Sequence, residues 1–135
     1  MYKSLLLALS LVFVFACTKD ANNSDDNVNP GSTDVVLSSG TFKNGVHTTS
    51  GSVKLIKDKD GKKFLLFENF YVDKGPDLHI YLSNALTDTD YTDVTKTVTN
   101  GNVRLAVPTG AKDTQKFVLI WCKAAAVLFG SAELK

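Results

Sequence analysis

From Val35 to the end of the chain, apolar and polar residues alternate with a period of two. Turn-forming residues interrupt this alternation about every eight to twelve positions, a spacing typical of all-β sandwiches and barrels. No stretch shows the spacing of an amphipathic helix. The pattern predicts one all-β domain over residues 35–135, an antiparallel β-sandwich of the Ig-like or jelly-roll-like kind.

The most apolar stretch of this domain is Phe117–Cys122, which holds the only Trp of the chain. A short apolar run bounded by turn residues predicts a strand that is buried on both faces. Alternation places Cys122 on the same face as Val118 and Ile120, opposite Trp121. We therefore expect the core to form around this strand and to enclose the Cys122 thiol.

Two further pairs of segments predict hairpins. Residues 48–57 and 62–72 flank Asp58–Gly61, which has the composition of a tight turn. An EF-hand calcium loop does not fit there, because Ile56 stands where the first carboxylate ligand belongs. The second expected hairpin joins Val94–Thr99 to Asn102–Val107 through Asn-Gly, a strong hairpin signal.

Three other strands are expected. Leu78–Ser83 alternates in a way that predicts a half-buried strand with His79 and Tyr81 on its polar face. A short first strand and a closing strand, which is either stopped or bulged at Gly130, complete the domain. These two segments are Val35–Leu37 and Lys123–Phe129.

Residues 1–16 have the pattern of a secretory leader. Their apolar run, Leu5–Phe15, is shorter than the roughly 20 residues that span a bilayer. Val14–Cys17 resembles the lipoprotein box of bacteria, in which the cysteine is acylated and becomes the first residue after cleavage, although Phe15 stands where a small residue is usual. We expect a signal peptide over residues 1–16 and a lipid anchor on Cys17; a plain secretory leader with an incidental cysteine is the alternative.

Residues 17–34 then form the lipidated cysteine and a linker. The segment after Cys17 has no aromatic residue and one aliphatic residue, Val28, so it cannot bury enough surface to offset the entropy of ordering. Its acidic residues resemble signals that send some lipoproteins to the outer cell surface, although a solvated linker explains the same residues better. The expected location is the cell envelope, at the outer membrane or cell surface.

Charge adds little. The chain of 135 residues has 15 Lys and Arg against 14 Asp and Glu, for a formal net charge of +1. This balance does not predict a nucleic-acid partner, because such proteins carry a basic patch or stripe. The expected partners are the membrane, through the lipid on Cys17, and a redox protein or another surface protein.

Several short motifs of the domain follow the pattern of a known family, and the match runs from about Ser39 to Leu134. On these residues the domain resembles the DM13 family. The motifs are Gly40-Thr41-Phe42, Ser50-Gly51-Ser52-Val53, Phe67-Glu68-Asn69-Phe70, Gly75-Pro76-Asp77-Leu78 with Tyr81-Leu82, Ile120-Trp121-Cys122 and Phe129-Gly130-Ser131-Ala132.

The resemblance implies a nearly all-β extracellular domain, found in some proteins beside cytochrome-like modules. It also implies a cysteine that acts in redox chemistry, as a thiol or as the ligand of a prosthetic group; here that residue is Cys122. The residues themselves leave two interpretations open. A lone exported thiol suggests reactivity or intermolecular pairing, whereas free cysteine is often a small core residue and inert when buried in apolar surroundings.

His47 and His79 are the other candidate metal ligands, and with Cys122 they would suit a copper site of the electron-transfer kind. No His or Met follows Cys122 closely, as such sites usually require, and no C-x-x-C-H motif for covalent haem occurs. Non-covalent haem through either histidine stays open, as does calcium at Asp88, Asp90 and Asp93. No hydrolase or phosphate-binding motif is present, so the sequence requires no cofactor and indicates an electron-transfer accessory module, or a binding or adhesion module with no catalytic group.

Overall fold

The computed structural model describes residues 30–31 and 33–135. This part of the chain forms nine strands, and no helix within it is long and apolar enough to cross a membrane. The leader, Cys17 and most of the expected linker lie outside the described residues. The strands are β1 Val35–Thr41, β2 Lys43–Asn44, β3 Thr49–Lys57, β4 Lys63–Val72, β5 Leu78–Ser83, β6 Tyr91–Thr95, β7 Gly101–Ala106, β8 Phe117–Cys122 and β9 Val127–Glu133.

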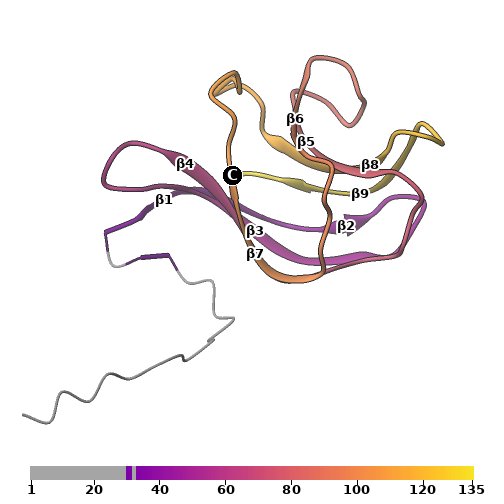
Figure 1. Ribbon diagram of the computed structural model, residues 1–135, viewed down its shortest axis with the longest axis horizontal. Coiled ribbons are helices and arrows are strands. Elements are labelled where there is room, and N and C mark those ends of the chain that lie inside the picture. The colour runs from indigo at the N-terminus through magenta and orange to yellow at the C-terminus, as the bar shows by residue number, and fades with distance from the viewer. Residues whose placement is uncertain (1–29, 32) are drawn as a thin grey trace, which may run out of the picture.

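The strands form two antiparallel sheets that pack face to face. One sheet has the order β1-β3-β4-β7, and the other, which we call the β8 sheet, has the order β2-β9-β8-β5-β6. In Figure 1 the strands β5, β8 and β9 lie above β3 and β7. This arrangement confirms the predicted all-β sandwich.

The main core lies between the two sheets and contains the inward-facing residues of both. On β4 these include Leu65 and Phe67, and on β8 they are Val118, Ile120 and Cys122. All five are at most 1% exposed. Alternation on each strand thus places the apolar side chains where the sheets face each other.

A second cluster lies on the outer face of the β8 sheet and consists of Tyr81, Leu119 and Trp121, with Phe117 and Leu128 packed against them. Strand β8 is therefore buried on both faces, as its continuous apolar sequence predicts. Strand β5 differs from the prediction, because its expected polar face is buried as well: His79 is 7% and Tyr81 1% exposed. Aromatic neighbours and the carboxylates of adjacent segments cover that face.

The prediction of a second hairpin, between Val94–Thr99 and Asn102–Val107, is wrong. Strand β6 begins at Tyr91 and pairs with β5, whereas β7 pairs with β4 in the other sheet. The chain therefore crosses from one sheet to the other at Asn100. The Asn100 side chain takes the place of a strand partner: its Oδ1 accepts from the Val72 amide, and its Nδ2 donates to the Val72 carbonyl.

The first hairpin is confirmed, because β3 pairs with β4 in antiparallel register around the Asp58 turn. Asp58 Oδ1 accepts the amides of Asp60 and Lys62, which closes that turn. The closing strand begins later than expected, at Val127, after a turn over residues 123–126. The strand is not stopped at Gly130 but continues to Glu133. The alternative of a bulge is confirmed, because the register with β8 shifts between Ile120, which pairs with Gly130, and Trp121, which pairs with Leu128.

Candidate functional site

Cys122 is the last residue of β8, the middle strand of the β8 sheet. Its side chain is 0% exposed and belongs to the core between the sheets. On either side its register partners are Leu78 of β5 and Val127 of β9. The next residue, Lys123, donates its amide to the Asp77 carbonyl, which holds the end of β8 against the Gly75–Asp77 loop.

The surroundings of Cys122 are apolar. It is a free cysteine, and within the described residues its thiol makes no hydrogen bond and no ion pair. The nucleophilic form of cysteine is the thiolate, which requires stabilisation by nearby positive charge or hydrogen-bond donors. In this closed conformation the core offers neither to Cys122.

The buried titratable group of the β8 sheet lies on the opposite face. His79 Nδ1 is 2.7 Å from Asp93 Oδ2, and His79 Nε2 is 3.1 Å from Asp77 Oδ1. Because ionised carboxylates only accept hydrogen bonds, both contacts are satisfied together when the imidazole ring carries both protons. We call His79, Asp77 and Asp93 the histidine clamp; it joins β5, β6 and the Gly75–Asp77 loop.

Aromatic side chains surround the clamp on this outer face. Tyr81 stacks on Tyr91 with ring centroids 4.0 Å apart, and the rings of His79 and Tyr81 are 5.7 Å apart. Trp121 is the register partner of His79. Burial, together with a hydrogen bond that the Tyr81 hydroxyl donates to Tyr91, raises the pKa of the Tyr81 phenol far above its ordinary value of 10.0, so Tyr81 stays neutral.

The candidate ligands His47, His79 and Cys122 are not brought together into a metal site. His47 is an exposed residue whose ring lies 3.9 Å from that of Phe129 and whose Nδ1 is 3.6 Å from Asp73 Oδ2. His79 and Cys122 lie on opposite faces of the β8 sheet. Across residues 30–31 and 33–135 no group of three His, Cys, Asp or Glu side chains is arranged to hold a metal ion.

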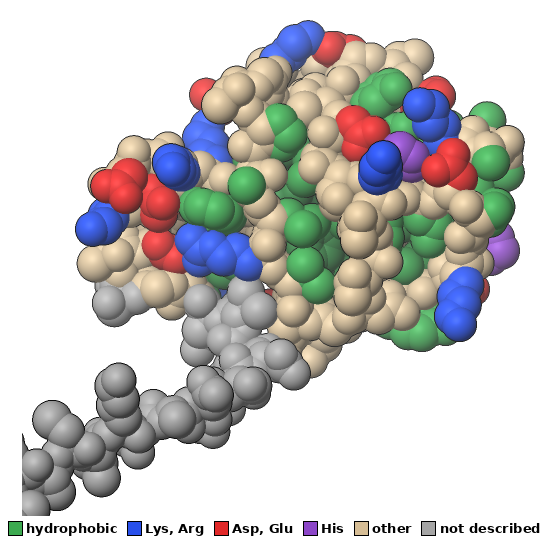
Figure 2. Space-filling model, viewed as in Figure 1, with side chains coloured by type: hydrophobic (Ala, Val, Ile, Leu, Met, Phe, Trp, Pro, Cys, Tyr) green, Lys and Arg blue, Asp and Glu red, His purple; other side chains and the backbone are tan. Residues whose placement is uncertain are grey.

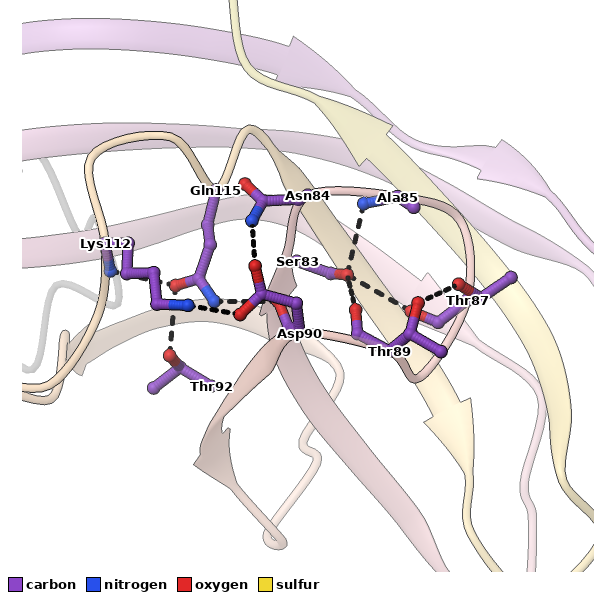
Figure 3. A network of polar contacts seen from close by, with 9 residues as sticks. All are labelled: Ser83, Asn84, Ala85, Thr87, Thr89, Asp90, Thr92, Lys112 and Gln115. Carbon is purple, nitrogen blue, oxygen red and sulfur yellow. Dashed lines mark hydrogen bonds and ion pairs between the residues drawn. The ribbon is translucent and has the colours of Figure 1, made fainter.

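Two of the three candidate calcium ligands, Asp90 and Asp93, have other partners. Asp90 pairs with Lys112 and with the Asn84 amide, while Asp93 belongs to the histidine clamp. In Figure 3 these contacts form part of a polar network that links the 84–90 loop to residues 112–115. These contacts give Asp90 and Asp93 a structural role.

Two buried polar residues of this network carried no sequence signal of their role. Gln115 is 5% exposed; its Oε1 accepts from Thr92 and from the Lys112 amide, and its Nε2 donates to the Asp90 carbonyl. Ser83 is 0% exposed and donates toward the carbonyls of Thr87 and Thr89. Their hydrogen bonds hold the loop against the end of β5 (Figure 3).

Two pockets lie at opposite ends of the sandwich, and Cys122 lines neither. One, of about 510 Å³, lies at the Gly75–Asp77 loop and includes Leu78, the register partner of Cys122. The other, of about 410 Å³, lies beside the β3–β4 turn. A prosthetic group bound through sulfur needs open space beside it, so the Cys122 environment does not fit such a group.

A two-sheet antiparallel sandwich with one buried free thiol at the end of its middle strand defines the class of this domain. The family model described as Electron transfer DM13 matches residues 41–134, and the chain belongs to this family. The resemblance stated from the sequence motifs is thereby confirmed. Comparisons with curated proteins and with solved structures find no match. The family indicates an electron-transfer-related module.

Proposed function

We propose that this protein is an electron-transfer accessory module of the cell envelope, anchored by acyl chains on Cys17, and that it acts through the Cys122 thiol. The observation that carries the role of Cys122 is its position: it is the free thiol of the described domain and ends the middle strand of the β8 sheet. The family description supports the electron-transfer class.

Thiol chemistry requires a way to reach the sulfur, because exchange depends on access as well as on the thiolate. Leu78 pairs with Cys122 and also lines the pocket at the Gly75–Asp77 loop, so we expect the route to the sulfur to pass this side chain. Gly75 packs closely there, since a Cβ on it would lie 2.7 Å from the Leu78 side chain. We expect this loop to move when Cys122 reacts.

The test is the rate at which a thiol reagent modifies Cys122 in the native full chain, compared with the rate of global unfolding. We expect modification to exceed unfolding, and Leu78→Ala to accelerate it at least about tenfold by removing the covering side chain. Val46→Ala, which truncates an exposed apolar residue elsewhere, is the control. Modification only at the unfolding rate in all three proteins argues against a reactive Cys122, and a visible chromophore bound through sulfur overturns the thiol assignment.

A binding or adhesion module is the second candidate. It is favoured by the complete burial of Cys122 among apolar residues, the environment of a structural cysteine. Its test is Cys122→Ala in a strain that lacks the wild-type protein. A variant that folds, reaches the envelope and restores the wild-type phenotype favours binding, whereas a folded variant that fails to do so favours the redox role.

The anchor is tested separately at Cys17. Attachment of more than one acyl chain gives stable membrane binding, whereas a single acyl chain binds only marginally. Metabolic labelling with a fatty-acid analogue is expected to mark the wild-type protein and to leave Cys17→Ala unmarked. A labelled Cys17→Ala protein, or an unlabelled wild type, contradicts the proposed lipoprotein.

A further inference from the structure

The pocket beside the β3–β4 turn is separate from Cys122 and from the histidine clamp. It has a volume of about 410 Å³, which falls within the roughly 300–1,000 Å³ of small-molecule sites. Its apolar residues come from both sheets and from the loop that follows β7. They are Leu55, Phe64, Leu82, Ala106, Val107, Pro108 and Ala111.

The inner end of the pocket is formed by residues at the edge of the core between the two sheets. Leu82 belongs to the buried core, and Leu55, Val107 and Ala111 are partly buried residues packed against it. Their side chains are aliphatic, so the space between the sheets suits an aliphatic group. Such a group would remove apolar surface from water on both sheets, which is the main favourable contribution to binding in sites of this kind.

The rim of the pocket is positively charged. It carries Lys62, Lys63 and Lys112 and a single carboxylate, Asp113. Figure 2 shows hydrophobic side chains in the hollow beside the β3–β4 hairpin, at the left of the view, with Lys or Arg side chains at its border. An anionic head group at the mouth of the pocket therefore meets net positive charge.

Lys112 is already paired with Asp90, but Lys62 and Lys63 are available to a ligand. Lys62 is exposed and makes no ion pair with the described residues. Lys63 Nζ is 2.5 Å from Asp113 Oδ1, but the Asp113 side chain is 86% exposed. Exposed pairs of this kind contribute little, so Lys63 can exchange Asp113 for an incoming anion.

From this combination we infer that the pocket binds an aliphatic carboxylate, with its chain between the sheets and its carboxylate at Lys62 and Lys63. The site lies at the opposite end of the sandwich from the Gly75–Asp77 loop. It goes beyond the proposed electron-transfer role and does not depend on it. Cys122→Ala is therefore expected to leave the binding unchanged.

The probe is decanoate, titrated into the full chain below its micelle concentration and followed by calorimetry and amide chemical shifts. We expect saturable binding at one site, with the largest shifts at Gly61, Thr109 and Ala111. Decanol, which lacks the charge, and acetate, which lacks the chain, are expected to bind more weakly. Absence of saturable decanoate binding, or shifts confined to other parts of the domain, overturns the inference.

The matched variants remove equal charge at the two ends of the sandwich. Lys62→Gln with Lys63→Gln is expected to weaken decanoate binding about three- to tenfold, the usual value of partly exposed charge contacts. Lys74→Gln with Lys96→Gln, at the other pocket, is expected to change it less than about twofold. Equal weakening by both pairs, or equal binding of decanol and decanoate, contradicts recognition of the carboxylate at this rim.

A filling variant tests the apolar part. Ala111→Leu adds side-chain volume within the pocket and is expected to lower decanoate affinity while Lys62 and Lys63 remain. Amide spectra establish that each variant is folded, and if Ala111→Leu does not fold, the charge variants still decide. A folded Ala111→Leu protein that binds decanoate as the wild type does overturns the assignment of the chain to this pocket.

Discussion

The two faces of the β8 sheet place chemistry-bearing residues in opposite environments. The inner face carries Val118, Ile120 and Cys122 among apolar side chains of the facing sheet. The outer face carries Tyr81 and Trp121 together with His79, whose two ring nitrogens contact carboxylates. Both faces are buried, but only the outer one contains charged partners.

Residues that are neighbours in the sequence therefore lie on opposite faces of the β8 sheet. Trp121 and Cys122 are consecutive, yet one packs in the outer cluster and the other in the main core. The histidine clamp therefore offers no direct contact to the Cys122 sulfur. Any activity of Cys122 depends on opening the inner face, whereas the clamp residues of the outer face already lie among polar partners.

The largest expected effect is on the inner face. Ile120→Ala truncates a side chain that is 0% exposed, and the free energy of unfolding is expected to fall by about 3–4 kcal/mol, because the change leaves a cavity in a closely packed core. Chemical denaturation measures it. Val36→Ala, at an aliphatic residue that is 48% exposed, is the control and is expected to cost less than about 1 kcal/mol. Equal losses would show that the core around β8 is not closely packed.

Cys122 tests whether the inner face tolerates a polar atom. Cys122→Ser places a hydroxyl where no described partner lies, and is expected to lower the free energy of unfolding by about 2 kcal/mol. Cys122→Ala leaves only a small cavity and is expected to cost about 1 kcal/mol. Urea denaturation of the two variants gives the order. A serine variant as stable as the wild type would place a hydrogen-bond partner or water beside Cys122.

The histidine clamp tests the outer face. In His79→Gln, the glutamine side chain lacks the two ring nitrogens that contact Asp77 and Asp93. Hydrogen bonds to charged groups contribute about 1.5–3 kcal/mol, and the partial exposure of both carboxylates, 45% and 41%, reduces the expected loss to about 1–2 kcal/mol. Denaturation at neutral pH measures this loss.

The matched control is His47→Gln. The His47 side chain is 44% exposed and lies 3.6 Å from its nearest carboxylate oxygen, on Asp73, so the substitution is expected to cost less than about 0.5 kcal/mol. A larger loss at His47 than at His79 would contradict the view that the outer face is held together by the clamp.

Much of the fold follows from local pattern. The continuous apolar run of β8 predicts burial on both faces, and the alternation within it places Cys122 inward, as found. The Asp58 turn supplies its own hydrogen bonds and so identifies the first hairpin. The Asn-Gly pair at Asn100 led to the wrong prediction, because the Asn100 side chain bonds to the Val72 backbone, 28 positions earlier in the chain. No local pattern reports such a contact.

The outer site was less predictable for the same reason. His79 and Asp77 are close in sequence, but Asp93 reaches His79 only because β6 pairs with β5. Sequence alternation indicated that His79 shares a face with Tyr81, and it could not show that the face is covered. Burial of Gln115 likewise depends on contacts from Thr92 and Asp90, which lie in distant segments.

The smallest expected effect concerns the loop that borders the outer face. A hydrogen-bonded ion pair with Lys112, assisted by the Asn84 amide, lowers the pKa of Asp90 below its ordinary value of 3.8. The unfolded chain therefore binds the proton more tightly, so the stabilisation is fully present above the unfolded pKa and is lost as the pH falls through the lower folded pKa.

Asp90→Asn is expected to reduce stability at neutral pH, with the difference in stability from wild type narrowing below about pH 4. Thermal denaturation across this range measures the gap, and Lys112→Gln, which removes the same pair from the other side, is expected to reproduce it. A gap that stays constant with pH would mean that the loop is held by Gln115 and Ser83 alone, independently of charge.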